Sequence, residues 1–395
     1  MKQIIDEGIR NQQKYSHKPT VEKQYVEQAI HFILHKMDEN LATFTEFFPG
    51  PVSFGNIYKP TENTDWTTSF WTGMLWLAYE VTGDPKYRRV AVIQLKSFRA
   101  RVEKRMGTDT HDLGFLYTLS CMAAFKLTGS EQAKETALMA AELLTERYYD
   151  KAGILQAWGD LNDPTQRGRM IIDCLMNLPL LYWASDVTGD QKFRNMAYSH
   201  AKQAAKYIVR EDASCYHTFY MEPQTGEPIG GKTCQGFSDD SSWARGQAWA
   251  IYGFPLSYIY TGDESFLDIA VKMANYFLNR LPQDDVCYWD LIFTQGSQER
   301  DSSSAAIAAC GLLELSKHLP TTHPNKTIYE NAALKMLQSL TDSYTTKTHP
   351  NSNGILLHGV YNKPGNCGVD ECCIWGDYFY FEALVRLQKQ WNLYW

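Results

Sequence analysis

The chain has 395 residues, of which 44% are apolar and 13% aromatic, and its formal net charge is −7. This composition can bury a large core, and an acidic balance without a basic run argues against nucleic acid or an anionic membrane surface as a partner. A small acidic substrate remains compatible, because a single local arginine or histidine can hold one.

The cysteines and the N-terminus indicate a compartment. The nine cysteines include no Cys-x-x-Cys pair, and several lie in apolar runs, where a thiol behaves as a small hydrophobic group. This pattern favours a reducing cytosol over a disulfide framework. The first residues lack the apolar stretch of a signal peptide, and no run has the length of a membrane span. We therefore expect a cytoplasmic protein without a membrane partner, either a monomer or a homodimer.

A short phrase recurs at four places in the chain. Each copy ends in Thr-Gly-Asp or Thr-Gly-Ser, and the copies span 79–84, 125–130, 185–190 and 258–263. A glycine can adopt the left-handed conformation that ends a helix, and the following Asp or Ser can cap the next one. Each phrase therefore predicts a tight corner between two helices, and the recurrence indicates a repeat architecture.

The segments on the two sides of these corners differ. Those after a corner are apolar on one side, whereas those before it are apolar nearly all round, which predicts an outer and an enclosed inner helix. In chain order the outer and inner helices are 20–40 and 67–81, 84–103 and 111–127, 130–148 and 170–187, 190–210 and 243–260, 263–281 and 302–317, and 325–345 and 374–391. Six such pairs predict an all-α fold, an (α/α)6 barrel of twelve helices in inner and outer rings. We expect one domain over 1–395; an open helical solenoid is the alternative.

The long connections lead from an outer helix to the next inner one, so they should emerge at the same end of the ring. They span 41–66, 149–170, 211–242, 282–301 and 346–374, and functional groups are expected there, where the inner helices begin. The stretch 232–249 suits a sugar-binding rim. It also suits a helix capped by Ser238, Asp239 or Asp240, whose Arg245 pairs with an acid.

Two carboxylates are prominent among the residues that open the inner helices. Asp112 follows His111 and precedes an apolar run, and Asp173 is predicted to lie a turn inside its helix. A carboxylate flanked by apolar residues is costly to bury unless it is hydrogen-bonded or used. Two carboxylates at one cavity are the minimum for acid/base chemistry on a sugar, so we predict a catalytic pair. The polar and aromatic residues expected beside them are Trp66, Trp158, His217 and Arg245.

Other kinds of site have less support. Asp301 and Asp377 are expected to cap helix N-termini and not to bind ligands. We expect no metal, since no cluster of Cys and His stands out as a ligand set. No glycine-rich phosphate loop follows a strand, and no Gly-x-Ser-x-Gly motif is present, so we expect no nucleotide cofactor and no serine nucleophile.

Five motifs resemble those of the bacterial unsaturated glucuronyl hydrolases, in the same order and over nearly the whole chain. They are Asn63-Thr64-Asp65-Trp66, His111-Asp112-Leu113-Gly114-Phe115, Asp173-Cys174-Leu175-Met176-Asn177, Gly236–Trp249 and Ile374-Trp375-Gly376-Asp377-Tyr378. The resemblance implies an (α/α)6 barrel and a hydrolase that removes the 4,5-unsaturated uronic acid from lyase-generated fragments of chondroitin or hyaluronan. In that chemistry an aspartate protonates C-4, water adds at C-5, and the resulting hemiketal opens and releases the next sugar.

The resemblance also implies roles for individual residues. Asp173 resembles the general acid/base, and Asp112 resembles the second essential acid, which positions the ring hydroxyls. His217 and Gln235 match residues near the hydrating water and the uronate, and Arg245 matches an arginine that contacts the substrate. The remaining matches are the histidine before the first aspartate and aromatics that line the sugar site: His111, Trp66, Trp158 and Trp249.

One stretch departs from the family pattern. Relatives that favour sulphated chains share Ser-x-x-Ser-x-Lys shortly before Gly-Val-Asp, whereas here Asn362–Cys367 takes that place and only Lys363 is nearby. We therefore hypothesise a weaker dependence on sulphate.

Three other functions are compatible with parts of the pattern. An unsaturated rhamnogalacturonyl hydrolase acting on pectin fragments would use the same fold and chemistry. A sugar epimerase on this fold would need a pair of catalytic histidines on inner helices. A helical toroid that binds a protein would need an exposed apolar groove.

Overall fold

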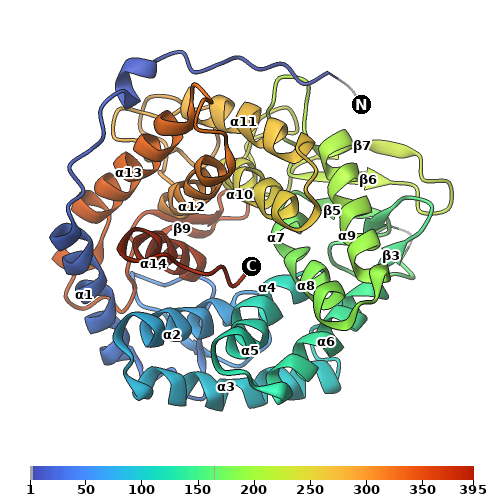
Figure 1. Cartoon of the computed structure of the whole chain (residues 1–395), viewed down its shortest axis with the longest axis horizontal. Helices are drawn as coiled ribbons and strands as arrows, with labels where there is room; N and C mark the ends of the chain where they lie inside the picture. The colour runs from blue at the N-terminus through green and yellow to red at the C-terminus, as the bar shows by residue number, and fades with distance from the viewer. Residues whose placement is uncertain (1–2, 164) are drawn as a thin grey trace.

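The structure is a computed structural model that describes residues 3–163 and 165–395. Its helices form a closed ring with an inner and an outer layer (Figure 1), which confirms the predicted (α/α)6 barrel. The inner layer contains α2 (Thr68–Thr82), α4 (Leu113–Tyr117), α5 (Ala123–Thr128), α7 (Cys174–Asn177), α8 (Pro179–Thr188), α10 (Ala244–Thr261), α12 (Ser302–His318) and α14 (Ile374–Gln388). The outer layer contains α1 (Lys23–Asn40), α3 (Pro85–Glu103), α6 (Glu131–Thr145), α9 (Gln191–Gln203), α11 (Ser265–Leu278) and α13 (Lys326–Ser343).

The four predicted corners are present and follow the expected chemistry. Each glycine is left-handed, with φ between 68° and 78°, and its N–H bonds to the carbonyl four residues earlier; these are Gly83, Gly129, Gly189 and Gly262. At the first three corners the next side chain caps the outer helix by accepting a backbone N–H bond. At the fourth, Asp263 accepts from the N–H of Ser265, where α11 begins.

The third inner helix differs from the prediction of one helix over 170–187. Residues Arg169–Ile171 form strand β5, Asp173 stands at the N-cap of the short α7, and α8 starts at Pro179. The strand forms because its backbone groups bond to β6 (Thr218–Met221). Proline has no N–H to donate, and it is favoured at the start of a helix. Asp173 is therefore at a strand-to-helix junction, and not a turn inside a helix.

The long connections contain all the strands of the described residues and are joined to one another. The strands are β5, β6 and β7 (Pro228–Lys232) in one sheet, and the hairpins of β1 (Phe48–Pro49) with β2 (Pro60–Thr61), β3 (Tyr148–Tyr149) with β4 (Ile154–Leu155), and β8 (Gly359–Asn362) with β9 (Cys367–Glu371). Single bridges link further segments: Val52 with Cys373, Thr110 with Trp158, and Trp243 with Asp290. These segments make a continuous rim where the inner helices begin.

The C-terminal tail closes the opposite end of the ring. In Figure 1 the chain ends at the centre of the inner layer, and Trp395 is only 2% exposed. Its indole stacks on Phe379 at 5.7 Å between centroids and meets Phe115 edge-on. Lys126, at the end of α5, donates to the carbonyls of Leu393 and Tyr394. Lys126, Tyr260 and Glu80, which form the polar contacts with the tail, lie at the C-terminal ends of inner helices, so the tail covers the end of the ring that carries the corners, while the Trp395 indole reaches inward to Phe379 and Phe115.

A cluster of buried charges lies beside this tail. The Arg386 guanidinium contacts carboxylate oxygens of Glu314 at 2.6 Å and Glu382 at 3.0 Å, and both glutamates are fully buried. Glu382 also accepts bonds from Tyr252 and from the indole N–H of Trp395. The cluster links α10, α12, α14 and the tail through charge-assisted hydrogen bonds.

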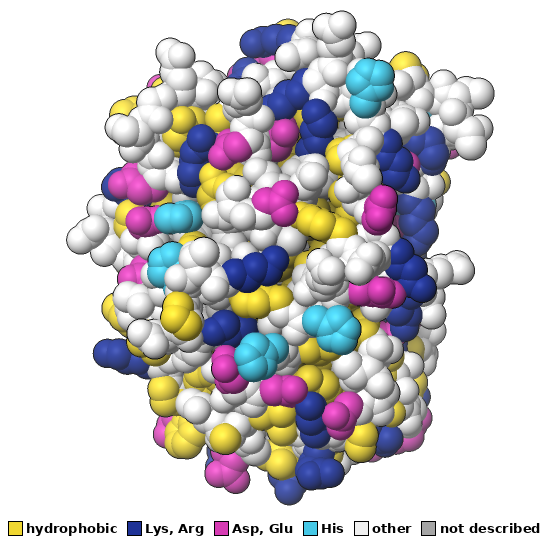
Figure 2. All heavy atoms as spheres, turned by 90° about the vertical axis from the view of Figure 1, so that its left-hand side faces the viewer, with side chains coloured by type: hydrophobic (Ala, Val, Ile, Leu, Met, Phe, Trp, Pro, Cys, Tyr) yellow, Lys and Arg dark blue, Asp and Glu magenta, His cyan; other side chains and the backbone are white. Residues whose placement is uncertain are grey.

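The outer surface carries charges of both signs. Figure 2, which views the side of α1 and α13, shows lysines and arginines interspersed with aspartates and glutamates. Within the described ranges, none of the helices combines the length and apolarity that a bilayer span requires.

Candidate active site

A cavity of about 120 Å³ opens at the rim, among the first residues of the inner helices. All nine residues predicted from the sequence line it, together with three others. The lining consists of Trp66, His111, Asp112, Trp158, Ile171, Asp173, His217, Gln235, Trp243, Arg245, Trp249 and Tyr361. Residues from four of the five long connections and from the shorter connection before α4 thus converge on one space, as the same-end arrangement of the long loops predicted.

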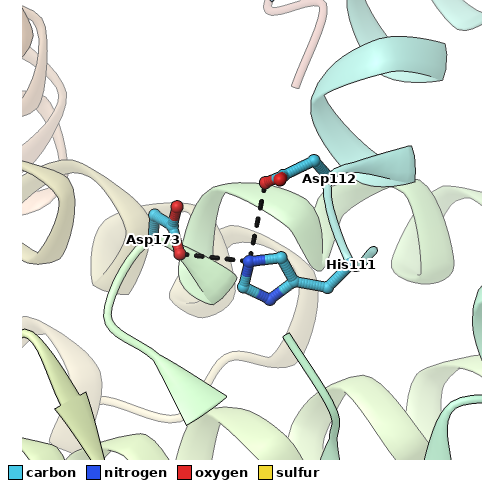
Figure 3. Close-up of side chains that lie close together, drawn as sticks. All are labelled: His111, Asp112 and Asp173. Atoms are coloured by element: carbon cyan, nitrogen blue, oxygen red, sulfur yellow. Dashed lines mark ion pairs between the residues drawn. The ribbon is translucent and has the colours of Figure 1, made fainter. Parts of the chain in front are cut away.

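His111 lies between the two predicted catalytic acids (Figure 3). Its Nε2 is 3.2 Å from an oxygen of Asp173 and 3.5 Å from an oxygen of Asp112. These contacts are ion-pair contacts; neither ring nitrogen forms a well-aligned hydrogen bond within the described residues. The His111 side chain is 2% exposed, whereas the two carboxylates are 14% and 17% exposed, so the acids face the cavity from either side of the ring.

The close contacts shift the pKa values of His111 and Asp112. Burial lowers the pKa of His111, but the Asp173 and Asp112 carboxylates outweigh this effect and raise the pKa above its usual value. Burial raises the pKa of Asp112 to about 6, although His111 opposes the rise. The cluster therefore keeps protons at a pH where isolated carboxyl groups have lost them, which suits acid/base chemistry.

The spacing of the two acids is fixed by a close contact between α4 and α7. The side-chain oxygen of Asn177 accepts the N–H of Phe115 at 2.7 Å, and its amide donates to Asp112 at 3.3 Å. Gly114 allows this approach, because a Cβ at that position would lie 2.3 Å from the Asn177 backbone. The hydroxyl of Thr110 donates to the other oxygen of Asp112 at 2.8 Å.

His217 has a defined tautomer. Its Nδ1 accepts the backbone N–H groups of Cys234 at 2.9 Å and Gln235 at 3.2 Å, so the neutral ring carries its proton on Nε2. Burial lowers the pKa of His217 to about 3, and the positive charge of Arg245 adds to this shift, whereas Asp173 opposes it. A neutral His217 can donate a hydrogen bond from Nε2 but is poorly suited to take up a proton.

Arg245 is occupied by contacts within the protein. It is 1% exposed, and it donates to the carbonyl of Val360 at 2.5 Å, to the carbonyl of Tyr361 at 2.7 Å and to the side-chain oxygen of Gln235 at 2.5 Å. An oxygen of Asp301 lies 3.5 Å away, so the reading of an arginine paired with an acid is confirmed. A direct contact of Arg245 with a substrate stays a prediction.

The aromatic lining has a buried and an exposed part. Trp66 stacks on Trp375 at 5.3 Å and donates its N–H to the hydroxyl of Tyr361 at 3.1 Å. Trp249 is 1% exposed and packs against Phe115, so it forms the deep wall. Trp158, in contrast, is 41% exposed and offers a free face at the rim.

Tyr361, Trp243 and Ile171 were not among the predicted site residues. Trp243 lies in the stretch 232–249, which was read as a loop followed by a helix start, and its ring packs 4.4 Å from that of His217. Tyr361 lies in β8, within the long connection 346–374. The alternation of Val360 and Tyr361 in a short strand was the available signal.

Three predictions about helix caps had different outcomes. Asp301 is confirmed as the N-cap of α12, with bonds from the N–H groups of Ser303 and Ser304. Asp377 is not a cap: it lies inside α14 and accepts the N–H groups of Ile355 and Leu356 from the neighbouring connection.

The proposed cap of the helix in 232–249 was wrong. That helix, α10, begins after Trp243 without a side-chain cap. Asp239 accepts the N–H of Thr233 instead, and Ser241 bonds to Asp290, because the loop folds back on itself before the helix starts.

The cluster of His111, Asp112 and Asp173 is also the one group in the described residues with metal-ligand spacing. One possible ligand atom from each residue lies within 4.8 Å of the others. His31 and His35, one turn apart, are exposed on α1 of the outer ring. The expectation of no metal stays a prediction.

Comparison with known proteins gives concordant matches over almost the whole chain. The family model of Glycosyl Hydrolase Family 88 matches residues 43–387. The unsaturated chondroitin disaccharide hydrolase of Streptococcus pneumoniae is 49% identical over 396 residues, with 100% of both chains covered. The unsaturated glucuronyl hydrolase of Bacillus sp. strain GL1 is 45% identical over 370 residues, which cover 93% of this chain and 98% of the relative.

Solved structures show the same fold. The crystal structure of unsaturated glucuronyl hydrolase from Streptococcus agalactiae superposes with a TM-score of 0.98 at 48% identity and full coverage of both chains. The Bacillus sp. GL1 enzyme superposes with a TM-score of 0.90 at 45% identity, over 92% of this chain and 97% of that one.

Proposed function

We propose a reaction for this chain, which belongs to Glycosyl Hydrolase Family 88 and is a glycoside hydrolase. It removes the 4,5-unsaturated uronic acid from the non-reducing end of lyase-generated glycosaminoglycan oligosaccharides. The observation that carries the proposal is the cluster of His111, Asp112 and Asp173 in an aromatic-lined cavity. Relatives of 45–49% identity named for unsaturated glucuronyl or chondroitin disaccharide hydrolysis support it. One related structure, an Asp-to-Asn variant of the S. agalactiae enzyme, is described as complexed with dGlcA-GalNAc6S.

In the proposed reaction Asp173 acts first as an acid and then as a base. Its proton goes to C-4, and the positive charge that develops at C-5 lies close to the carboxylates of Asp173 and Asp112. Water then adds its oxygen to C-5 and returns a proton to Asp173. The resulting hemiketal opens by breaking the bond between C-5 and the ring oxygen; the C-5 hydroxyl gives up its proton as C-5 becomes a ketone, and the ring oxygen takes up a proton. C-1 then carries a hemiacetal, which breaks its bond to the glycosidic oxygen; C-1 becomes an aldehyde, and the next sugar leaves with a free hydroxyl.

The other lining residues have roles that follow from their hydrogen-bond capacity. His217 can donate its Nε2 proton to the incoming water or to a substrate oxygen. The oxygen of the Gln235 amide is held by Arg245, which leaves the amide N–H groups for the uronate carboxylate. Asp112 accepts ring hydroxyls on the oxygens that Thr110 and Asn177 orient.

The test uses the ultraviolet absorbance of the conjugated double bond, which hydration removes. Unsaturated chondroitin and hyaluronan disaccharides are incubated with the wild type, with Asp173→Asn, and with Asp150→Asn as an exposed control outside the cavity. We expect loss of absorbance with the wild type and the control only. If no unsaturated glucuronyl disaccharide reacts, the proposal is wrong, and consumption of an unsaturated rhamnogalacturonan fragment would then identify the pectin-directed alternative.

The epimerase alternative is disfavoured by the state of the second cavity histidine. His111 and His217 both line the cavity, but His217 uses Nδ1 as an acceptor and its pKa is about 3. An epimerase needs two groups that exchange protons near neutral pH, and His217 does not meet that requirement.

We also propose that turnover depends weakly on sulphate. The ammonium group of Lys363, the cation nearest the place of the missing serine motif, is paired with Glu299 and is thus neutralised. Comparable kcat/KM values on sulphated and unsulphated chondroitin disaccharides are expected. A strong preference for the sulphated substrate would contradict this part of the proposal.

We further propose that the protein works in the cytoplasm. All nine cysteines are free thiols, and seven of them are buried. Fractionation of the native host should recover the activity with a cytoplasmic marker; recovery outside the cell would overturn this assignment.

A further inference from the structure

Arg169, the first residue of β5, is a buried cation that forms no ion pair within the described residues. It is 8% exposed, and among the described residues no carboxylate oxygen lies within 4.0 Å of its guanidinium. Its Nε donates to the hydroxyl of Tyr220 at 3.0 Å, whereas its Nη1 is buried and makes no hydrogen bond within the described part of the chain.

Such an arrangement costs free energy, because a buried charge is normally paired and hydrogen-bonded. Two other cations near the rim follow that rule: Arg245 has Asp301, and Lys363 has Glu299. Arg169 gains a partial substitute from aromatic rings. Its guanidinium carbon lies 3.6 Å from the ring centre of Trp158 and 5.3 Å from that of Tyr220.

This cation lies directly behind the cavity wall. Side chains alternate along a strand, so Arg169 is on the same side of β5 as Ile171, which lines the cavity. The indole of Trp158 has the guanidinium against its ring and also lines the cavity. The positive charge of Arg169 reaches the cavity residues, since it contributes to the lowered pKa of His217.

We propose that Arg169 is a specificity-determining residue, which holds Trp158 as a flat wall for a sugar ring and makes that wall electropositive, so that the cavity selects sugars carrying an anionic group. This inference rests on the proposed function, and it identifies a residue that determines the preference for a negatively charged substrate. Since we propose a weak dependence on sulphate, the expected anionic group is the uronate carboxylate of the first sugar; a sulphate on the second sugar is the other source, which the experiment distinguishes.

The experiment measures binding, so that it does not depend on turnover. In an Asp173→Asn background, calorimetry gives the affinity for an unsaturated chondroitin disaccharide, for its uronate methyl ester and for its sulphated form. The acid-to-ester ratio reports recognition of the carboxylate, and the sulphated-to-unsulphated ratio reports recognition of sulphate. Both ratios are then measured after Arg169→Met, which keeps an unbranched apolar stem, and after Arg169→Lys, which keeps the charge.

Arg280→Met is the matched control. This arginine also covers an aromatic ring, at 3.2 Å from the ring centre of Tyr276, but it has Glu7 as a partner and lies beyond the end of α11 on the outer layer. Thermal unfolding of all variants shows whether each one folds. A loss of stability alone lowers every affinity together and leaves both ratios unchanged.

We expect Arg169→Met to reduce one ratio by about tenfold, as a unit charge near the wall of a partly solvated cavity would produce. Arg169→Lys should retain most of the ratio, and Arg280→Met should change neither. A fall in the acid-to-ester ratio identifies the carboxylate, and a fall in the other identifies sulphate. Unchanged ratios in a folded Arg169→Met protein overturn the inference while the proposed function stands; no binding of any of the three ligands, with no turnover by the wild type, overturns both.

Discussion

Gly114→Ala tests whether the contact between α4 and α7 sets the distance between the two acids. The added Cβ would lie 2.3 Å from the Cα and the carbonyl oxygen of Asn177, where ordinary contact begins at 3.4 Å. The two backbones must therefore separate by about 1.1 Å, the difference between those two distances. Asp112 precedes Gly114 by two residues, and Asp173 precedes Asn177 by four, so the separation is transmitted to both carboxylates.

The expected effects on activity and stability differ in size. A misplacement of about 1 Å in a catalytic constellation costs on the order of 100-fold in rate. Overpacking of this kind destabilises by about 1–3 kcal/mol, which leaves a folded protein at room temperature. We therefore expect kcat on an unsaturated disaccharide to fall by about 100-fold, in the absorbance assay, at a temperature well below the melting point.

Gly311→Ala is the control for steric crowding elsewhere in the inner ring. Gly311 in α12 also faces the backbone of a neighbouring helix, and a Cβ added to it would lie 2.8 Å from the backbone nitrogen of Tyr252 in α10. Neither Gly311 nor Tyr252 contacts Asp112 or Asp173. It should lower the melting temperature with little effect on kcat. A wild-type kcat for Gly114→Ala, or equal losses of kcat for both variants, would refute the role assigned to this contact.

Three further predictions concern buried charges. Burial raises the pKa of Asp112 from 3.8 to about 6, so the ionisation of this carboxyl group opposes folding. Asp112→Asn should therefore stabilise the protein by up to about 3 kcal/mol above pH 6, and this gain should vanish below about pH 4. Urea unfolding across this pH range measures the difference in stability, and a difference that does not change with pH would contradict the prediction. Nitrogen NMR should show His217 as the neutral Nε2–H tautomer from about pH 5 to 8, whereas a titration near its ordinary pKa would contradict the assignment. Arg386→Met should destabilise by about 3–5 kcal/mol, because Glu314 and Glu382 would remain buried without a cation; a change below about 1 kcal/mol in urea unfolding would show that the cluster is not coupled.

The ring could be predicted from the sequence because its signals are local. A glycine that ends one helix and an Asp or Ser that caps the next act within six residues, and the enclosed helices are apolar all round. The prediction of the third inner helix was wrong for the opposite reason. Met170-Ile171-Ile172 is compatible with either a helix or a strand, and the partner that decides between them, β6, is nearly 50 residues away.

The residues that line the cavity could also be predicted, because an (α/α)6 ring brings every long connection to the same end. What each residue does there was less predictable. Arg245 lines the cavity as predicted, but its bonds to the backbone carbonyls of β8 could not be foreseen, because the hairpin pairing of β8 is not visible in the sequence. The sequence assigned no role to Arg169, because a buried charge can be seen to have no ion-pair partner only when all its neighbours are known.

Among the described residues, the C-terminal tail backs the cavity at the end of the ring opposite the rim. Trp249 and Phe115 separate the cavity from Trp395, and the tail covers the end of the ring behind them. A blind pocket of this kind accepts only the tip of a linear polymer, so internal linkages are out of reach and shortening proceeds one unit at a time. Product release is ordered as well. The remaining oligosaccharide, which protrudes from the cavity, must dissociate before the sugar bound deepest in the cavity can leave.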